Sequence, residues 1–380
     1  MSDLETFDSL NLKEELLRGI FSYGFENPSP IQQKAIPVMN SKRDLIAQAQ
    51  SGTGKTGAFT IGVLNNIDVS SNTIQAIIIN PTHELANQNL NVIKELSNFM
   101  NVNVQLVVGG TSVSKCKADL EKNPHVVVGT PGRILDMIQK RNLETKNIKL
   151  LIFDEADEIL SFGFKESIYN IIKFIPVDTQ ICIYSATMPN EIIELTDKFM
   201  RDPEKILVQK ENLTLDGIIQ FYINVKHSDW KYDTLIDIYE TINVSQCIIY
   251  VNSKTRLIDI CNGLKDKGFP VECIHGDLSG EIRKTIMEDF KSGKLRMLLS
   301  TDLLSRGIDI QQLSLVINYD LPIEKETYIH RIGRSGRYGR KGVSINFVTD
   351  RDVEKLKELQ SYYNTKIEEM PQNINDYLNI

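Results

Sequence analysis

The sequence predicts an α/β protein of two tandem domains, each with a mostly parallel sheet flanked by helices. The chain has 380 residues, whereas one domain usually holds about 100–200. Along it, short β-branched apolar runs alternate with stretches of helical periodicity. Most of the apolar runs lack polar alternation, which indicates strands buried on both faces of a parallel sheet. Alternating strands and helices are typical of doubly wound α/β folds.

The first half of the chain opens with a helical pattern and continues with six candidate strands. Leu12, Leu16 and Ile20 have the four-residue spacing that places apolar side chains on one face of a helix. The strands are predicted at DLIAQA (44–49), QAIIIN (75–80), VQLVV (104–108), HVVVG (125–129), KLLIF (149–153) and QICIY (180–184).

The second half repeats the alternation with five candidate strands and closes with another helical pattern. The last helix is predicted from the spacing of Val353, Leu356, Leu359 and Tyr363. The strands are predicted at QFYINV (220–225), QCIIYV (246–251), LRMLLS (295–300), LVINY (315–319) and VSINFV (343–348).

A charged stretch, residues 201–217, separates the two halves; it contains Pro203 and lacks a long periodic pattern. We place a linker near residues 209–217 within it. The predicted division is therefore a first domain at 1–210, a linker at 211–217 and a second domain at 218–380.

The composition is that of a soluble globular protein, with 41% hydrophobic and 24% charged residues. A net charge of −7 argues against a protein that binds polyanions through bulk charge. The five cysteines have no C-x-x-C spacing, so we expect buried thiols rather than a disulfide framework or a zinc site. The N-terminus lacks an apolar signal core, and no run reaches the ~18 apolar residues of a membrane helix. We expect a cytoplasmic protein, with the nucleus as the alternative.

The segment AQAQSGTGKT (47–56) follows a predicted strand and precedes a helical run. This context suits a phosphate-binding loop, in which glycines let backbone N–H groups and a helix N-terminus face an anion. Lys55 would reach the β- and γ-phosphates, and the Thr56 hydroxyl would bind Mg²⁺. Ala49 occupies the first glycine position of the usual pattern G-x-x-x-x-G-K-[ST]. A flexible glycine-rich turn beside a surface lysine is therefore the alternative.

The segment LLIFDEAD (150–157) runs from four apolar residues straight into acidic ones, as at the carboxyl end of a buried strand. Asp154 is a candidate to hold Mg²⁺ through water, and Glu155 a candidate to accept a proton from an attacking water. The alternative is an acidic helix N-terminus that the helix dipole favours. Combined with the lysine loop, the acidic pair favours ATP hydrolysis.

The segment HRIGRSGRYGRKG (330–342) gathers positive charge in an acidic chain. A patch for nucleic-acid phosphates and a site for one particular phosphate both fit it. Three-residue spacing drifts around a helix axis, and Gly333 and Gly336 disfavour a long helix. The arginines therefore need not share a face or a role; they are Arg331, Arg334, Arg337 and Arg340.

These motifs together resemble those of the DEAD-box RNA helicases, and further matches follow in the family's order. GFENPSPIQ (24–32), with Phe7 upstream, is similar to the adenine-reading Q motif. Within the family, two segments look closest to the helicase subunit of the eukaryotic cap-binding initiation complex, and a splicing-linked clamp is nearly as similar. The segments are INYDLPIEKETYIHRIGRSGRYGRKG and YYNTKIEEMP. The other matches are PTHELA (81–86), Gly109–Gly110, TPGR (130–133), SAT (185–187), HGD (275–277) and STDLLSRGID (300–309).

The resemblance implies two RecA-like domains with ATP bound between them. Gln32 would hydrogen-bond adenine, and Phe25 would pack on the base. Asp157, Ser185 and Thr187 would form a polar link that reports the nucleotide state, and His330 and Arg331 would connect the arginine segment to that link and to its own domain. Arg340 and Lys341 would remain a local basic surface. Implied catalytic residues are Lys55, Asp154, Glu155 and the arginine fingers Arg334 and Arg337; further ATP contacts are Ser51, Gly52, Thr53, Gly54, Thr56 and Asp309.

The resemblance also implies RNA contacts through small hydroxyls, glycine amides and one arginine, which hold the backbone without reading its sequence. RNA would be preferred to DNA through its 2′-OH groups. Taken singly, each residue fits a loop or a helix cap at least as well. The implied set is Thr82, Gly110, Thr130, Gly132 and Arg133 in the first domain, and Asn252 and Thr301 in the second.

Two positions depart from the family pattern in a way that bears on function. His83 stands where the family usually has arginine. A histidine, with an ordinary pKa near ~6.5, is mostly neutral at pH 7. Our hypothesis is weaker RNA binding that improves below neutrality. Gly280 stands in place of a common glutamine, which leaves the partner of Arg283 undefined.

The predicted function is an ATP-dependent RNA helicase that closes on ATP and RNA, bends one strand, unwinds a short duplex and reopens after hydrolysis. An ATP-gated RNA clamp with little unwinding fits the same motifs. The DEAD and arginine motifs argue against a P-loop kinase or metabolic ATPase, which hydrolysis unstimulated by RNA would favour. A DNA helicase is a further alternative, and an assay that compares DNA and RNA duplexes would decide it. The subfamily resemblance implies a monomer in translation initiation, docked on a protein scaffold that contacts both domains.

Overall fold

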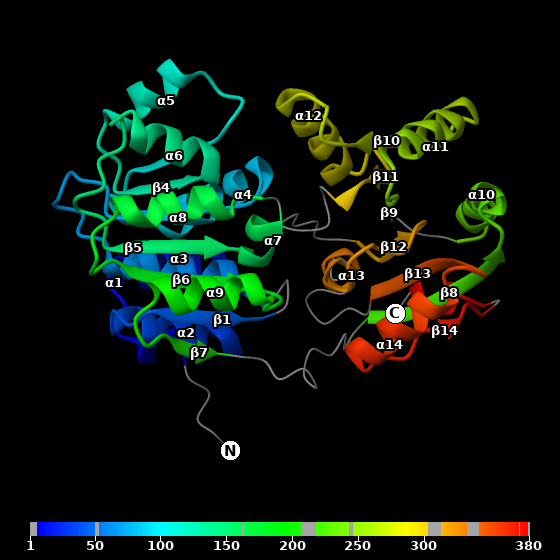
Figure 1. Ribbon diagram of the computed structural model, residues 1–380, viewed down its shortest axis with the longest axis horizontal. Helices are drawn as coiled ribbons and strands as arrows, with labels where there is room; N and C mark the ends of the chain where they lie inside the picture. Colours follow the sequence, from blue (N-terminus) through cyan, green and yellow to red (C-terminus); the bar gives the residue numbers. More distant parts are fainter. Residues whose placement is uncertain are drawn as a thin grey trace. The chain divides into compact units, whose positions relative to one another are not determined.

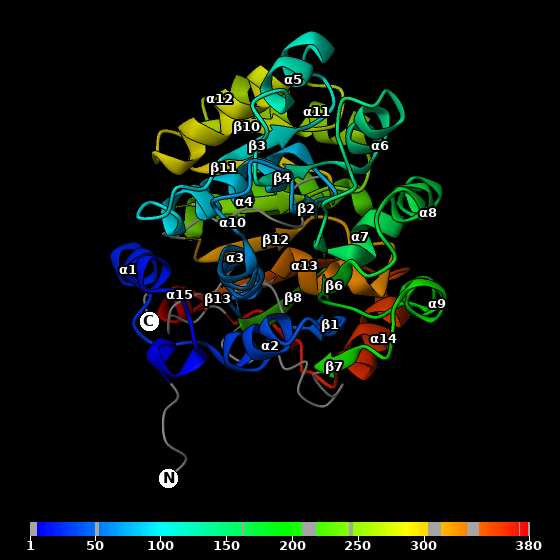
Figure 2. The same cartoon turned by 90° about the vertical axis from the view of Figure 1, so that its left-hand side faces the viewer.

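The computed structural model of the protein describes residues 6–49, 53–161, 163–206, 218–242, 246–302, 313–332, 342–371 and 373–378. The chain divides into two compact units, Met1–Val208 and Gln209–Ile380. Each unit is a parallel sheet with helices on both faces (Figures 1 and 2). The predicted linker at 211–217 lies outside the described residues.

The sheet of the first unit has seven strands in the order β3-β4-β2-β5-β6-β1-β7, and all of its pairings are parallel. The register pairs Ile79 with Phe153, so β2 and β5 end side by side at one edge of the sheet. The strands are β1 (Leu45–Gln48), β2 (Ala76–Ile79), β3 (Val104–Val107), β4 (Val126–Gly129), β5 (Leu150–Asp154), β6 (Gln180–Ser185) and β7 (Glu204–Ile206).

The strands of this sheet feed two apolar cores, one on each face, because successive side chains of a strand point to opposite sides. In β5, Leu150 and Ile152 pack into the first core, whereas Leu151 and Phe153 pack into the second. The first core includes residues of η1 (Phe7–Leu10), α1 (Glu14–Tyr23), α2 (Pro30–Asn40), α3 (Lys55–Asn66) and α4 (His83–Leu96); the second includes residues of α5 (Val113–Leu120), α6 (Pro131–Gln139), α7 (Ala156–Ser161), α8 (Lys165–Phe174) and α9 (Asn190–Phe199).

The sheet of the second unit also has seven parallel strands, in the order β10-β11-β9-β12-β13-β8-β14. Its strands are β8 (Ile218–Lys226), β9 (Cys247–Tyr250), β10 (Val271–Ile274), β11 (Met297–Ser300), β12 (Leu315–Asn318), β13 (Gly342–Thr349) and β14 (Glu368–Glu369). The helices are η3 (Ser228–Trp230), α10 (Lys231–Thr241), α11 (Lys254–Asp266), α12 (Gly280–Lys291), α13 (Lys325–Ile332), α14 (Val353–Tyr363) and α15 (Asn375–Leu378).

The predicted fold class is confirmed, and every predicted strand overlaps an observed one. β7, β10 and β14 were not predicted, and all three lie at sheet edges. An edge strand pairs on one side only, so it needs no continuous apolar run. Accordingly, β7 reads EKI, β14 reads EE and Glu272 interrupts β10.

Both predicted terminal helices form, as α1 and α14. Leu16 and Ile20 are buried as expected, whereas Leu12 precedes the first residue of α1 and packs on the core from the preceding segment. At the other end, Leu356 and Tyr363 are buried.

The five cysteines are free thiols, and four of them are buried as predicted. Cys273 corrects the expectation because it is only half-buried. It lies in β10, an edge strand, where one side of the strand has no neighbour in the sheet.

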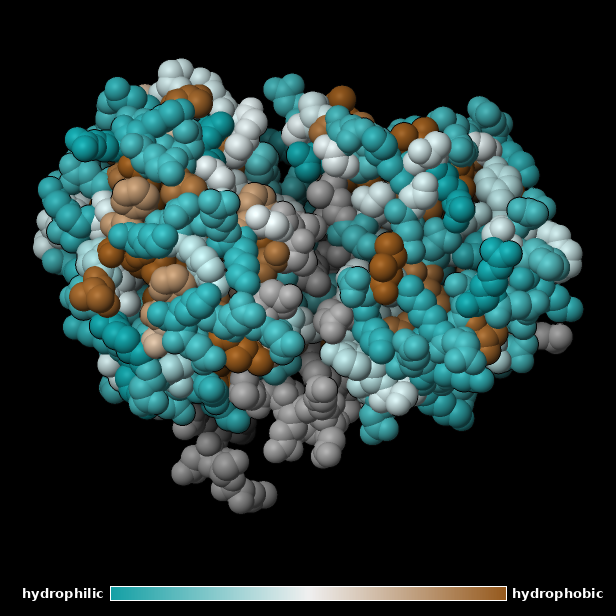
Figure 3. Space-filling view, in the orientation of Figure 1, coloured by the Kyte–Doolittle hydropathy of each residue, from teal (hydrophilic) through white to brown (hydrophobic). Residues whose placement is uncertain are grey.

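The visible face of each unit is mainly hydrophilic, and its hydrophobic residues form small separate groups (Figure 3). Within the described ranges, none of the helices has both the length and the apolar character needed to cross a bilayer.

Candidate functional site

The predicted phosphate loop connects β1 to α3, and Lys55 is the first residue of that helix. Gly54 precedes it with a φ of 99°, in the left-handed region that favours glycine. A Cβ atom at Gly54 would lie 2.7 Å from Ser29 Oγ and 2.9 Å from Gln32 Nε2. Conformation and space therefore both demand glycine here. Ser51 and Gly52 lie outside the described residues.

The two predicted adenine contacts lie over the first turn of α3. Gln32 is buried, its Oε1 accepts the Ser29 N–H at 2.8 Å and its Nε2 donates to the Gly54 carbonyl at 3.3 Å. A Cβ atom at Gly57 would lie 2.5 Å from Gln32 Nε2 and 3.1 Å from the Phe25 ring. The Phe25 ring stacks on the buried Phe7 at 6.3 Å between centroids.

Lys55 and Glu155 form a buried ion pair at the carboxyl end of β5. Lys55 Nζ donates to both carboxylate oxygens of Glu155 at 3.2 Å, and both side chains are only 5% exposed. Glu155 has a φ of 50°, although it is not glycine. Such backbone strain costs about 1–3 kcal/mol and is concentrated at functional sites. The strain marks Glu155 as a residue that the fold holds in place.

Asp154, the last residue of β5, is buried beside this pair. Asn89 Nδ2 donates to its Oδ2 at 2.8 Å, and Asn80 Nδ2 donates to the same oxygen at 3.3 Å. Burial, reinforced by the neighbouring Glu155 carboxylate, raises the pKa of Asp154 to about 7. The positive charge of Lys55 and the hydrogen bond from Asn89 oppose that rise.

The three residues of the predicted polar link meet because β5 and β6 are neighbours in the sheet. Thr187 Oγ1 donates to Asp157 Oδ2 at 2.6 Å, and the Asp157 N–H donates to Ser185 Oγ at 3.3 Å. All three are buried. The link is thus already present within the first unit.

The predicted RNA contacts of the first unit follow β2, β3 and β4, which are adjacent in the sheet and parallel. Thr82 caps α4, where its Oγ1 accepts the Leu85 N–H at 3.2 Å. Thr130 precedes α6, and a Cβ atom at Gly132 in the first turn would meet no atom within 4 Å. Arg133 Nη1 donates to the Thr111 carbonyl at 3.0 Å.

The loop after β3 lies against His83, the first residue of α4. Gly110 has a φ of 71°, which favours glycine. A Cβ atom at Gly109 would lie 3.3 Å from His83 Nε2. The imidazole that replaces the family's arginine is therefore next to the predicted RNA-contact loop.

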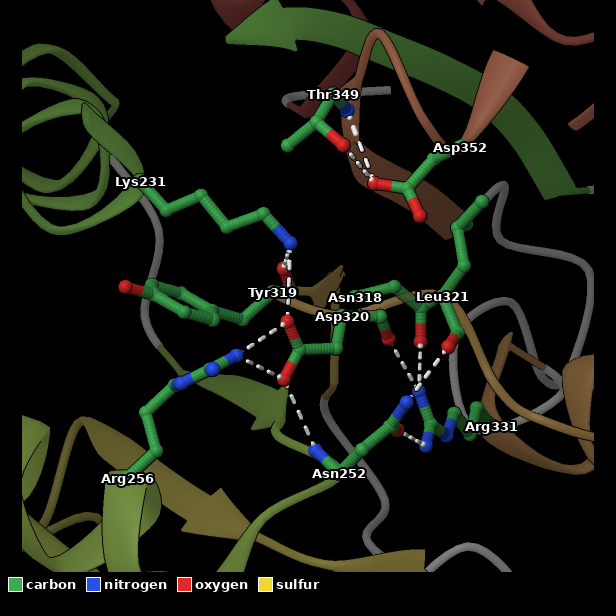
Figure 4. A network of polar contacts seen from close by, with 10 residues as sticks. All are labelled: Lys231, Asn252, Arg256, Asn318, Tyr319, Asp320, Leu321, Arg331, Thr349 and Asp352. Atoms are coloured by element: carbon green, nitrogen blue, oxygen red, sulfur yellow. Dashed lines mark hydrogen bonds and ion pairs between the residues drawn. The ribbon is translucent and has the colours of Figure 1, made fainter. Parts of the chain in front are cut away.

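In the second unit, the fully buried Arg331 joins the ends of three neighbouring strands. Figure 4 shows its contacts at the ends of β9 and β12. Its Nε donates to Asp302 Oδ1 at 2.6 Å, after β11. Its Nη1 donates to the Asp320 carbonyl at 2.7 Å, after β12, and its Nη2 to Asn252 Oδ1 at 2.7 Å, after β9. Arg331 is thus tied to its own unit, as the resemblance implied.

Asp320 anchors the other half of this network (Figure 4). Its carboxylate accepts from the buried Lys231 at 2.9 Å and from Arg256 at 3.3 Å. It also accepts the Asn252 N–H at 3.1 Å, while Asn252 Nδ2 donates to the Leu321 carbonyl at 2.9 Å. Because both ends of the Asn252 amide have partners in the unit, this side chain positions its loop.

The remaining predicted residues of the second unit are placed only in part. His330 is buried in α13, and Thr301 is half-buried directly after β11. Asp309, Arg334, Arg337, Arg340 and Lys341 lie outside the described residues.

Comparison with known proteins agrees with this geometry. A family model described as DEAD/DEAH box helicase matches residues 29–195, and one described as helicase conserved C-terminal domain matches residues 230–339. Eukaryotic initiation factor 4A from Caenorhabditis elegans is 52% identical over 375 residues, covering 99% of this chain and 93% of that protein. This chain belongs to the DEAD/DEAH box helicase family.

Two further likenesses support the assignment of this helicase. ATP-dependent RNA helicase eIF4A from Schizosaccharomyces pombe is 53% identical over 375 residues, covering 99% of this chain and 96% of that protein. The solved structure of S. cerevisiae Dbp5 bound to RNA and ADP BeF3 has a TM-score of 0.92 and 36% identity. It covers 98% of this chain and 97% of that one.

The site of this helicase also contains polar residues that were not predicted from the sequence. Asp320 stands just after a strand, β12, in the segment LVINYD, as Asp154 stands at the end of β5 in LLIFD, and this shared position was the available signal. Asn80 likewise ends QAIIIN at the carboxyl end of a strand. Lys231 and Asn89 carry no such signal, because their partners are distant in sequence and are set by the packing of a helix on the sheet.

Proposed function

We propose that the protein is an ATP-dependent RNA helicase that acts in cytoplasmic translation initiation, as a monomer docked on a scaffold protein. The observation that carries the proposal is the buried Lys55–Glu155 pair beside Asp154, at the sheet edge that also carries the predicted RNA-contact loops. The translation role is supported by the relatives named as initiation factor 4A.

ATP is proposed to bind over the first turn of α3. Gln32 and Phe25 already lie there and would contact adenine. The amides at the start of α3 and its dipole favour the phosphates, with Lys55 on the β- and γ-phosphates. The loop contacts would be Ser51, Gly52, Thr53 and Gly54, and the second unit would contribute Asp309.

A Mg²⁺ ion fits the oxygen donors at this edge. Among the described residues, no group of three or more His, Cys, Asp or Glu side chains gathers as a metal cage. Mg²⁺ rarely needs one, because it is usually held by one or two carboxylates, waters and substrate phosphates. Thr56 and Asp154 would hold it, and it would neutralise charge on the phosphates.

Glu155 is proposed to accept a proton from the attacking water. In the structure, both of its carboxylate oxygens accept hydrogen bonds from Lys55. When ATP binds, Lys55 would contact its phosphates in place of Glu155. The Glu155 carboxylate would then be available to act as a general base. Arg334 and Arg337 would stabilise the transition-state charge, a contribution worth roughly 10³–10⁵ in rate in related chemistry.

Coupling to RNA is proposed to run through the buried polar link. Asp157, three residues after the end of β5, is hydrogen-bonded to Thr187, two residues after the end of β6. His330 would join this link when ATP and RNA are bound. RNA would be held along its backbone by Thr82, Gly110, Thr130, Gly132, Arg133, Asn252 and Thr301.

Glu155→Gln tests the proposal. The wild-type protein should hydrolyse ATP faster with RNA than without it and should separate a short RNA duplex, but not the matching DNA duplex. Glu155→Gln should bind ATP and RNA yet lose turnover by about 10²–10⁴-fold, the usual effect of a general base. The matched control is Glu194→Gln, a surface glutamate paired with Lys165, which should behave as wild type.

Three results would contradict the proposal. Hydrolysis that RNA does not accelerate would indicate another kind of ATPase. Retained turnover in Glu155→Gln would show that Glu155 is not the general base. Slow turnover with a long-lived RNA complex and no strand release would identify an ATP-gated clamp instead.

A further inference from the structure

Two buried asparagines hold the carboxylate of Asp154. Asn80 follows β2 and is the cross-strand neighbour of Asp154, because Ile79 pairs with Phe153. Asn89 lies on α4, which packs over the same face of the sheet. Both side chains are fully buried, and both Nδ2 atoms donate to Oδ2 of Asp154, at 3.3 Å and 2.8 Å.

This arrangement has a cost in the fold. Since each amide turns its Nδ2 toward the carboxylate, its Oδ1 must turn away. Neither Asn80 Oδ1 nor Asn89 Oδ1 has a hydrogen-bond partner within the described part of the chain, and both are buried. A buried polar atom without a partner costs about 1–3 kcal/mol. The fold bears this cost at two positions for the sake of one carboxylate, because without the two amides the buried Asp154 Oδ2 would lose both of these donors.

The charges around Asp154 show what neutral amides can do there. Lys55 is bonded to both oxygens of Glu155, so this pair is balanced by itself. The two asparagines add donors to Asp154 without adding positive charge. They can therefore fix the orientation of the carboxylate and still leave its negative charge available to a cation. Both use Oδ2, so neither competes for Oδ1.

We propose that Asn80 and Asn89 are positioning residues that hold Asp154 so that its Oδ1 faces the Mg²⁺ of the bound nucleotide. The proposal rests on the ATPase function proposed above. Groups that hydrogen-bond a metal-binding side chain typically change metal affinity by about 10–100-fold when they are lost. The effect of Asn80 should be the smaller one, because its hydrogen bond is longer.

The test separates metal-dependent from metal-independent nucleotide binding. Binding of a fluorescent ATP analogue is titrated in EDTA and over a series of Mg²⁺ concentrations. In Asn89→Leu, the Mg²⁺ concentration that half-saturates the metal-dependent binding should rise about tenfold. In Asn80→Ala it should rise severalfold. Affinity in EDTA should stay within about twofold of wild type in both, because the contacts to base and phosphates are untouched.

The matched control is Thr60→Val. Thr60 is buried on α3. Like Asn80 Oδ1 and Asn89 Oδ1, its hydroxyl has no hydrogen-bond partner in the described residues, and it therefore makes no bond to Asp154. Removing it deletes a buried polar atom on the helix that begins with Lys55, without changing the hydrogen bonds to the Asp154 carboxylate. The Mg²⁺ requirement of Thr60→Val should equal that of wild type.

An unchanged Mg²⁺ requirement in the asparagine variants would overturn the proposal. Equal losses of affinity in EDTA and in Mg²⁺ would also overturn it, because they would indicate a distorted nucleotide site. If Asn89→Leu does not fold, Asn80→Ala decides by the same criterion. A wild-type protein that binds no ATP under either condition would refute the ATPase function itself.

Discussion

At His83, an imidazole takes the place of the arginine that the family usually has, next to the Gly109–Gly110 loop. A guanidinium there would be permanently charged and offer several donors to a phosphate. His83→Arg should tighten binding of single-stranded RNA by about 1 kcal/mol, roughly fivefold, in a fluorescence anisotropy titration. His83→Gln, neutral and similar in size, is the matched control. Equal affinities of His83→Arg and wild type would exclude a role for this position in RNA binding.

His125, at the amino end of β4, makes the stability of the first unit sensitive to pH. Its Nδ1 accepts the Asn103 N–H at 2.9 Å, and its side chain is buried. Burial lowers the pKa of His125, although the negative charge of Asp68 partly offsets this. A lowered pKa means that the folded state binds the proton less readily than the unfolded chain.

The contribution of His125 to stability is therefore complete above the ordinary histidine pKa of about 6.5 and is lost as the pH falls below it. In His125→Asn, the amide oxygen can still accept the Asn103 N–H. Urea unfolding between pH 7.5 and pH 5 should then show a shallower loss of stability than in wild type. An identical slope would show that other groups cause the acid sensitivity.

The sequence predicts the chemistry of the site where it is carried by short local motifs. Asp154 stands at the end of an apolar run, and Lys55 closes the glycine-containing loop that follows another, so their place at the carboxyl edge follows from the strand pattern. The ion pair of Lys55 with Glu155 and the left-handed backbone of Glu155 do not follow from it. They arise when a helix and a strand distant in sequence are packed together.

At the scale of elements, the central strands were predictable, whereas three of the four edge strands, β7, β10 and β14, were not. The exception is β3, which carries the apolar run VQLVV. Central strands are covered on both faces and on both sides, which demands a continuous apolar run. β7 and β14 carry charge because they are paired on one side only. Their pairing depends on the neighbouring strand being in place, and a local pattern cannot contain that information.

The contact between α1 and α4 depends on one glycine. A Cβ atom at Gly19 would lie 2.0 Å from the carbonyl oxygen of Leu96, the last residue of α4. The backbone of Leu96 cannot move aside as easily as the end of a flexible side chain could. Gly19→Ala should therefore destabilise the protein by about 1–3 kcal/mol or more. Chemical unfolding followed by circular dichroism measures this change.

Gly280 provides the control for that experiment. It is also a helical glycine, at the start of α12, but a Cβ atom there would meet nothing within 4 Å. Gly280→Ala should leave stability unchanged or raise it by up to about 1 kcal/mol, since alanine loses less backbone entropy than glycine. Equal destabilisation by both substitutions would contradict the close helix contact at Gly19.

At the scale of the whole molecule, the five thiols differ in reactivity. The thiolate is the reactive form, so burial protects a cysteine by raising its pKa. Burial raises the pKa of Cys247 to about 12 and that of Cys182 still further. Cys273 is half-buried, and a hydrogen bond from Cys261 lowers its pKa.

One thiol per chain should therefore react quickly with an aromatic disulfide reagent in the native protein, and the other four only after unfolding. Cys273→Ser should abolish the fast reaction, whereas Cys116→Ser should keep it. Two or more fast thiols in the native wild type would show that buried cysteines are exposed by opening of the fold.

The carboxyl end of β2 has a further consequence for how the chain tolerates insertions and deletions. Asn80 contacts the carboxylate of Asp154, and Thr82, the predicted RNA contact, caps α4. Only Pro81 separates them, and the ring of proline fixes its φ. Most connections in a protein accept an extra residue on their surface. A single residue inserted here would keep Asn80 and Thr82 but shift one relative to the other, so that they could not both keep their present contacts. The length of the segment 80–82 therefore matters more than most of its side chains.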